Sequence, residues 1–137
     1  MKEHYLGGGH IAIMTSNMEE SIEFYKKIGG SLVSLESLPD GDGEKQLALM
    51  RYAGYIVELI CPAKPEKQSD GIIAHFAVYV DDVDAATAEL EALGIDTFME
   101  PQKKVVPELF GGIENRFFRG PSGEQIELLY CNSFVNP

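Results

Sequence analysis

The sequence predicts an α+β fold built from two tandem βαβββ modules. The first observation is a repeat, because the five residues from His10 (HIAIM) align without gaps with the five from His75 (HFAVY). The second is that residues 54–60 (GYIVELI) align with residues 123–129 (GEQIELL), which places Glu58 on Glu127. The third is the order of patterns in each half, where one helical period is followed by several extended ones.

The first module is predicted at residues 10–61, after a short tail at residues 1–9. Its helix begins after Asn17, whose side chain suits an N-cap, and it ends at Gly29 and Gly30. Its predicted strands are His10–Thr15, Ser31–Leu38, Glu44–Tyr52 and Tyr55–Cys61. This order gives one complete βαβββ unit.

The second module is predicted at residues 72–131, and its helix runs from Asp81 or Asp82 to about Leu93. The apolar segment 101–112 is predicted to be irregular, as a lid or a dimer contact. Its predicted strands are Ile72–Val80, Ile95–Glu100, Ile113–Arg119 and Glu124–Tyr130. The remaining segments are a proline-containing linker at 62–71 and a C-terminal tail at 132–137.

Composition excludes several classes of function. The net charge of −11 and the lack of a basic stripe argue against nucleic acid and anionic membranes as partners. There is no apolar run long enough to cross a bilayer and no signal-peptide pattern, so a cytoplasmic protein is expected. Cys61 and Cys131 are too few for a disulfide framework and are expected to be reduced.

Strand alternation predicts a metal site. His10 and Glu58 should both lie on the sheet face away from the helix, and His75 and Glu127 repeat this arrangement. Two imidazoles and two carboxylates suit a first-row divalent ion, with positions left for water or substrate oxygens. The alternative is that each Glu forms a structural ion pair with the His of its own module. The residues predicted to line the substrate pocket on these faces are Met14, Ile56, Ile60, Tyr79, Gln125 and Leu129.

The closing stretch GPSGEQIEL (120–128) is similar to the Asp-Pro-x-Gly-x-x-Ile-Glu-Leu signature of the vicinal oxygen chelate superfamily. The twice-repeated βαβββ unit, with His on its first strand and Glu on its last, also resembles that superfamily. The set His10, Glu58, His75 and Glu127 resembles the four metal ligands of glyoxalase I. The resemblance implies a curved, half-barrel mixed sheet with its helices outside, the fold shared by glyoxalases, bleomycin-resistance proteins and dioxygenases.

The resemblance further implies a lactoylglutathione lyase-like enzyme, a lyase or isomerase that forms an enediolate from a hemithioacetal or related α-hydroxy-carbonyl substrate. Glu127 is the first candidate for the catalytic base and Glu58 the second. Nickel or cobalt is favoured and zinc is an alternative. A homodimer whose sites draw two ligands from each chain is expected. The alternatives are a methylmalonyl-CoA epimerase-like enzyme and a non-catalytic protein that binds a small molecule, such as a drug or antibiotic.

The chain departs from the glyoxalase I pattern at three places. Met14 stands where glyoxalase I has an arginine that helps to hold glutathione, and Cys61 and Pro62 follow Ile60 where an asparagine is usual. Gly120 replaces the usual aspartate of the signature. Glutathione is therefore not specified as the thiol. The candidate anchors for a substrate anion are Arg51, Arg116, Arg119, Lys103 and Lys104.

Overall fold

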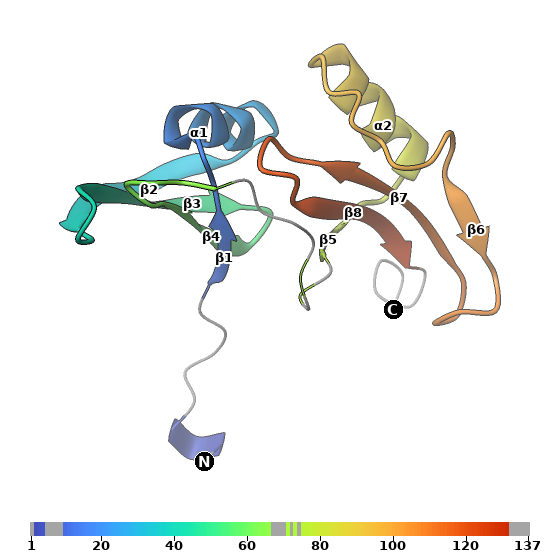
Figure 1. Ribbon diagram of the computed structural model, residues 1–137. Coiled ribbons are helices and arrows are strands. Elements are labelled where there is room, and N and C mark those ends of the chain that lie inside the picture. The colour runs from blue at the N-terminus through green and yellow to red at the C-terminus, as the bar shows by residue number, and fades with distance from the viewer. Residues whose placement is uncertain (1, 5–9, 67–70, 72, 74, 132–137) are drawn as a thin grey trace. The chain divides into compact units, whose positions relative to one another are not determined.

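The computed structural model describes residues 2–4, 10–66, 71, 73 and 75–131. The chain divides into two compact units, Met1–Glu66 and Lys67–Pro137. Each unit contains one α-helix and one four-stranded mixed sheet (Figure 1), which confirms the predicted α+β fold. No helix in the described part of the chain is long and apolar enough to cross a membrane.

The first unit has the order βαβββ after a short 3-10 helix. Its sheet has the strand order β1-β4-β3-β2, with β1 parallel to β4 and the other pairs antiparallel. The chain leaves β1 through α1 and returns in β2. Because β2–β3 and β3–β4 are both antiparallel, β4 runs in the same direction as β2. The elements are η1 (Lys2–His4), β1 (Ile11–Met14), α1 (Met18–Lys27), β2 (Ser31–Pro39), β3 (Glu44–Tyr52) and β4 (Tyr55–Cys61).

Helix α1 begins where the sequence predicts. Asn17 has an extended backbone, and its side chain accepts a hydrogen bond of 3.1 Å from the backbone N–H of Glu20. Tyr25 on the buried stripe of α1 is fully buried, and its ring makes an edge contact with Tyr52 of β3, with centroids 5.6 Å apart. Helix α1 therefore covers one face of this sheet and leaves the other face free of the helix (Figure 1).

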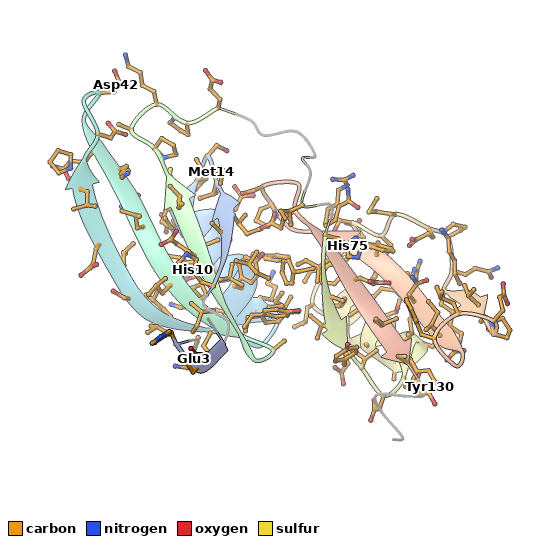
Figure 2. All side chains as sticks on the ribbon, turned by 90° about the horizontal axis from the view of Figure 1, so that it is seen from below. Glu3, His10, Met14, Asp42, His75 and Tyr130 are labelled. Carbon is orange, nitrogen blue, oxygen red and sulfur yellow. The ribbon has the colours of Figure 1, made fainter. Side chains whose placement is uncertain are left out.

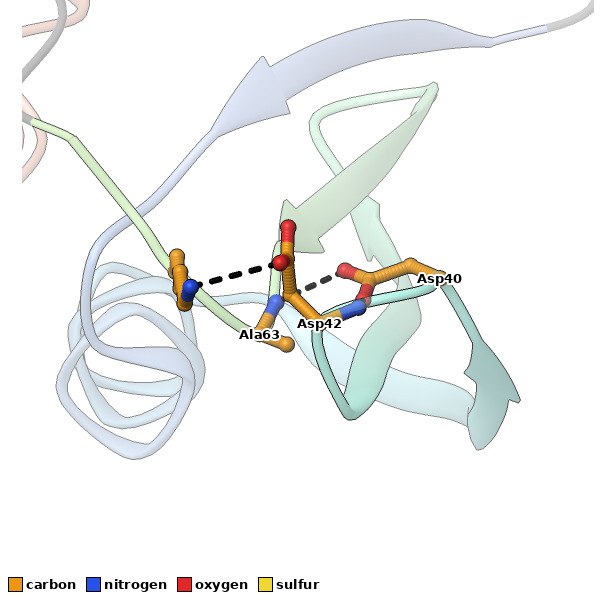
Figure 3. Close-up of polar contacts among 4 residues, drawn as sticks. Asp40, Asp42 and Ala63 are labelled. Atoms are coloured by element: carbon orange, nitrogen blue, oxygen red, sulfur yellow. Dashed lines mark hydrogen bonds and ion pairs between the residues drawn. The ribbon is translucent and has the colours of Figure 1, made fainter.

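Asp40 ties the turn between β2 and β3 to the segment after β4 (Figure 3). Its carboxylate accepts hydrogen bonds from the backbone N–H of Asp42 at 3.0 Å and of Ala63 at 2.9 Å. These two backbone donors, the Ala63 bond first, lower the pKa of the Asp40 carboxyl. Lys64 lies 3.3 Å from Asp42 at the same place. The start of the predicted linker is thus attached to the first module.

The second unit repeats the plan. Its sheet has the order β5-β8-β7-β6, with β5 parallel to β8. Asp82 caps the helix, since its carboxylate accepts a hydrogen bond of 3.0 Å from the backbone N–H of Ala85. Val83, Phe118 and Ile126 are fully buried between helix and sheet. The elements are β5 (Phe76–Tyr79), α2 (Val83–Ala92), β6 (Lys104–Val106), β7 (Ile113–Arg119) and β8 (Gln125–Cys131).

The predicted strand at Ile95–Glu100 is wrong, and so is the prediction that all of segment 101–112 is irregular. Only Phe98 forms an isolated bridge, to Phe118, and the edge strand β6 lies inside that segment. The reason is Glu100, whose carboxylate accepts a hydrogen bond of 2.9 Å from the backbone N–H of Phe117. A side chain therefore replaces a ladder partner, and the edge strand of this sheet is interrupted.

The first strand of each module is shorter than predicted. Residues 72 and 74 of the predicted strand Ile72–Val80 lie outside the described residues, and β5 starts only at Phe76. Strand β5 pairs with β8 from Phe76, which lies opposite Ile126. His10 and His75 each lie one residue before their strand rather than within it.

Candidate metal centre

His10 and Glu58 lie close together on the first sheet. Glu58 is in β4, the parallel neighbour of β1, and its register partner is Ala12, two residues after His10. Val57 and Leu59 are fully buried on the α1 side, so alternation turns Glu58 to the opposite face. Nε2 of His10 is 3.6 Å from Oε1 of Glu58, and the two side chains are 48% and 21% exposed.

His75 and Glu127 repeat this arrangement on the second sheet. Glu127 is in β8, and its register partner is Ala77, again two residues after the histidine. Ile126 and Leu128 are buried on the α2 side, so Glu127 faces away from the helix. Nε2 of His75 is 3.2 Å from Oε1 of Glu127, and the two side chains are 38% and 10% exposed. Figure 2 labels His10 and His75, which lie in different units.

The distances within each pair fit adjacent ligands of one metal ion. Bonds of about 2.1 Å place neighbouring ligand atoms about 3.0 Å apart at right angles and about 3.4 Å apart in a tetrahedron. The observed distances of 3.6 and 3.2 Å are close to these values. The donor set, one imidazole nitrogen and one carboxylate oxygen per module, is also typical of first-row divalent ions.

The same distances fit an ion pair within each module, the alternative raised by the sequence. Glu127 is nearly fully buried, and a buried carboxylate needs a partner, whether a metal, an imidazolium or a hydrogen-bond donor. Among the residues that the structure describes, no group of three or more His, Cys, Asp and Glu residues could hold a metal ion. Each pair by itself thus supplies two ligands.

Two residues of β7 support the second pair and were not singled out from the sequence. The Nδ2 amide of Asn115 donates a hydrogen bond of 2.7 Å to Oε2 of Glu127. The ring of Phe117 makes an edge contact with the imidazole of His75, with centroids 5.0 Å apart. The predicted turn between β7 and β8 could have identified them. It fixes Phe117 opposite Glu127, and strand alternation then places Asn115 on the same face.

The residues predicted to line a pocket lie on the same sheet faces as the two pairs. In the first unit Met14 pairs with Ile60 in register, two residues beyond Ala12 and Glu58. In the second unit Tyr79 pairs with Leu129 in the same way. Met14 and Tyr79 are exposed, and the other predicted lining residues are partly exposed, namely Ile56, Ile60, Gln125 and Leu129.

Two of the five predicted anion anchors, Lys103 and Arg116, are engaged by groups at the edge of the second sheet. Lys103 lies between Glu114, at 2.8 Å, and Asp84, at 3.2 Å, and its hydrogen bonds to these carboxylates raise its pKa. The guanidinium of Arg116 donates two hydrogen bonds to the backbone carbonyl of Glu100 and stacks 4.1 Å from the centre of the Phe98 ring. Both cations connect the interrupted edge of the second sheet to its neighbours.

The other three anchors differ in their surroundings. Arg119 donates a hydrogen bond of 2.7 Å to the carbonyl of Gly123 and so closes the β7–β8 turn. Arg51 occupies the equivalent place in β3, two residues after the partner of Glu58, and it is exposed. Lys104, at the start of β6, is exposed as well. Strand alternation puts Arg51 on the same face as Glu58.

Comparison with known proteins identifies the family of this fold. Residues 7–128 match the model of the Glyoxalase/Bleomycin resistance protein/Dioxygenase superfamily. The uncharacterized protein YwkD of Bacillus subtilis (strain 168) is 36% identical over 92 residues, which cover 64% of this chain and 72% of YwkD. The crystal structure of SMU.1112c is 26% identical, with a TM-score of 0.71 over 90% of this chain and 97% of that one. A glyoxalase family protein from Enterococcus faecalis is 23% identical, with a TM-score of 0.72 over 91% and 98%.

The chain therefore belongs to the Glyoxalase/Bleomycin resistance protein/Dioxygenase superfamily, also known as the vicinal oxygen chelate superfamily. Members of this superfamily are often metalloenzymes that bind a divalent ion, act on small molecules and form dimers. The repeated His and Glu positions are the part of this chain that fits such a role.

Proposed function

We propose that this protein is a metal-dependent, glyoxalase I-like lyase or isomerase that acts on a hemithioacetal or a related α-hydroxy-carbonyl compound. The observation that supports the proposal is the repeated pair, His10 with Glu58 at 3.6 Å and His75 with Glu127 at 3.2 Å, in the same strand register in both modules.

In this proposal one N-terminal pair and one C-terminal pair ligate one divalent ion, nickel or cobalt in preference to zinc. When bound, the ion acts as a Lewis acid that stabilises negative charge on the substrate oxygens. His10 and His75 serve as neutral nitrogen ligands. The two glutamates complete the set, and the remaining positions are left for the substrate.

One of the two ligand glutamates also moves the proton. Its carboxylate takes the proton from the carbon next to the carbonyl, so that the C–H bond breaks and its electron pair forms the carbon–carbon double bond of the enediolate. The same carboxylate then returns the proton to the adjacent carbon. Glu58 and Glu127 both face the side of their sheet where such a substrate would bind.

Arg51 is the best of the predicted anion anchors. It lies on the face of Glu58 and is exposed, whereas Lys103 and Arg116 are engaged by carboxylates and a carbonyl. We therefore propose that Arg51 binds a carboxylate or phosphate on the distal part of the substrate. Arg119, at the equivalent place in the second module, is the next candidate.

The proposed assembly is a cytoplasmic homodimer in which each site combines ligands of two chains. Cys61 and Cys131 are both free thiols, as is usual in a reducing compartment. Light scattering at micromolar concentration tests the assembly, and a monomer that still binds one metal ion per chain would contradict sites shared between chains.

A protein that binds a small molecule without catalysis is the second candidate. The observation that favours it is that each glutamate already lies within ion-pair distance of the histidine of its own module. Metal content separates the two functions. Protein purified without chelator is expected to contain one divalent ion per set of four ligands and to convert a methylglyoxal–thiol hemithioacetal to the thioester. Metal-free protein that does not bind added Ni²⁺ or Co²⁺ would favour the binder.

A further inference from the structure

The two His–Glu pairs differ in the residue beside the glutamate. Leu47 of β3 pairs with Ile60 in register, and Asn115 of β7 pairs with Leu129. Because Ile60 and Leu129 each lie two residues after the ligand glutamate, Leu47 and Asn115 occupy equivalent positions in the two modules. Duplication thus produced the same site twice, once with an apolar residue beside the carboxylate and once with an amide.

The amide of Asn115 holds one oxygen of Glu127. Its Nδ2 group donates to Oε2 at 2.7 Å, while Oε1 of the same carboxylate lies 3.2 Å from Nε2 of His75. Since an ionised carboxylate only accepts hydrogen bonds, the NH₂ group of the amide must face it. Within the described residues Glu58 lies at ion-pair distance from His10 and has no such amide donor, and its side chain is twice as exposed as that of Glu127.

The amide of Asn115 also destabilises the fold. With Nδ2 turned to Glu127, Oδ1 of Asn115 is buried, and within the described part of the chain it has no hydrogen-bond partner. A buried acceptor without a partner destabilises a protein, whereas a leucine here, as at Leu47, leaves no such group. Asn115 therefore does not serve stability alone, and its contact with Glu127 is the remaining explanation.

We propose that Asn115 is a positioning residue that fixes the Glu127 carboxylate through Oε2, so that Oε1 stays directed toward His75 as a stationary metal ligand. This inference rests on the proposed function. Phe117 supports the same pair by packing against the His75 ring. The C-terminal pair is then the preorganised half of the metal site, and the N-terminal pair is the more mobile half. Partners of this kind typically contribute about 10–100-fold to metal affinity.

Calorimetric titration of the full chain with Co²⁺ tests the proposal. Asn115→Leu copies the residue of the first module and should weaken Co²⁺ binding by about 10–100-fold. It should also change the visible absorption spectrum of the bound Co²⁺, which reports ligand geometry. Asn115→Ser, which removes the amide without adding bulk, should behave alike and covers the case that the leucine variant does not fold. Leu47→Asn is the matched control on the equivalent strand and should not weaken binding.

Failure of the inference and failure of the proposed function give different results. If Glu127→Gln weakens Co²⁺ binding while Asn115→Leu and Asn115→Ser keep wild-type affinity and spectrum, the positioning role is wrong and the metal site stands. If the wild-type protein binds no Co²⁺, the proposed function fails. In that case a ¹H–¹⁵N spectrum of the Asn115 side-chain amide tests whether Asn115 contacts Glu127. A shift in Glu127→Gln supports it, and an unchanged signal overturns it.

Discussion

His75 and Glu127 approach to 3.2 Å on the second sheet, with an aromatic ring against the imidazole and an amide on the far carboxylate oxygen. The equivalent approach of His10 to Glu58 is 3.6 Å, and neither contact is repeated there among the described residues. The two halves of the candidate metal centre therefore share a backbone register but differ in how firmly their side chains are held. This difference determines which substitutions should affect binding and which should affect turnover.

Replacing His75 by alanine should remove one of the four proposed ligands. We expect metal affinity to fall by more than about 100-fold, because the loss of a neighbour outside the ligand set already costs about 10–100-fold. Metal content after dialysis and calorimetry with Ni²⁺ measure the effect. His4→Ala is the matched control, since His4 is exposed and contacts only the exposed Glu3 among the described residues. Equal metal content in both variants would contradict the ligand assignment.

Glu58→Gln and Glu127→Gln should differ in their effects. The resemblance to glyoxalase I ranks Glu127 first as the base, but the amide of Asn115 holds Glu127 in place, and a carboxylate that shuttles a proton must move. Glu58→Gln is therefore expected to keep most of the metal and to lose about 10²–10⁴-fold in kcat, the usual contribution of a general base. Glu127→Gln is expected to lower metal affinity more than it lowers the kcat of the metal-loaded protein. Both quantities are measured on one hemithioacetal substrate, and the opposite result would assign the base to Glu127.

The buried phenol of Tyr52 should make the free energy of unfolding fall at alkaline pH. Burial raises the pKa of its phenol to about 12, whereas an unfolded tyrosine titrates near 10. The stabilising effect of the neutral phenol is complete below pH 10 and is lost as the pH rises toward 12, because only the unfolded chain then releases the proton. The loss should reach about 2–3 kcal/mol, from about 1.4 kcal/mol for each pKa unit.

The Tyr52→Phe variant should not show this loss. Urea unfolding at about pH 9 and at about pH 11.5 gives the free energies of unfolding of wild type and variant, and the difference between the two proteins should change with pH by this amount. Tyr79→Phe, which removes an exposed phenol, is the control. A wild-type stability that falls no faster than that of Tyr52→Phe would show that burial does not hold the proton on Tyr52.

The repeat and the strand alternation predicted most of the fold and the faces of the four candidate ligands. Strands β3 and β7 were predicted at their observed bounds, because dense apolar alternation and clear turns delimit them. The edge strand at Ile95–Glu100 was not predictable in the same way. This segment does not form a regular strand because the Glu100 carboxylate accepts a hydrogen bond from a backbone N–H of the neighbouring strand. Such a tertiary contact leaves no periodic pattern in the sequence. Asn115 was missed since an isolated asparagine in a strand has many structural roles.

The last prediction concerns Gly120, where the superfamily signature has an aspartate. A β-carbon at Gly120 would meet the carboxylate of Glu124, and Oε1 of Glu124 accepts a hydrogen bond of 2.9 Å from the backbone N–H of Ser122. An aspartate commonly makes this bond to the residue two positions on, as Asp40 does here with Asp42. We infer that Glu124 takes the place of the missing aspartate in this turn.

A double-mutant cycle tests this exchange. Glu124→Ala should lower the free energy of unfolding by about 0.5–1.5 kcal/mol, the usual contribution of one hydrogen bond. Adding Gly120→Asp should restore most of this loss, because the new carboxylate reaches Ser122 without meeting that of Glu124. Gly120→Ala in the same background should restore nothing. In the wild-type background Gly120→Asp should destabilise, since two carboxylates then share one turn and repel each other. If Gly120→Asp has the same effect in both backgrounds, the two positions are independent and Glu124 does not replace the aspartate.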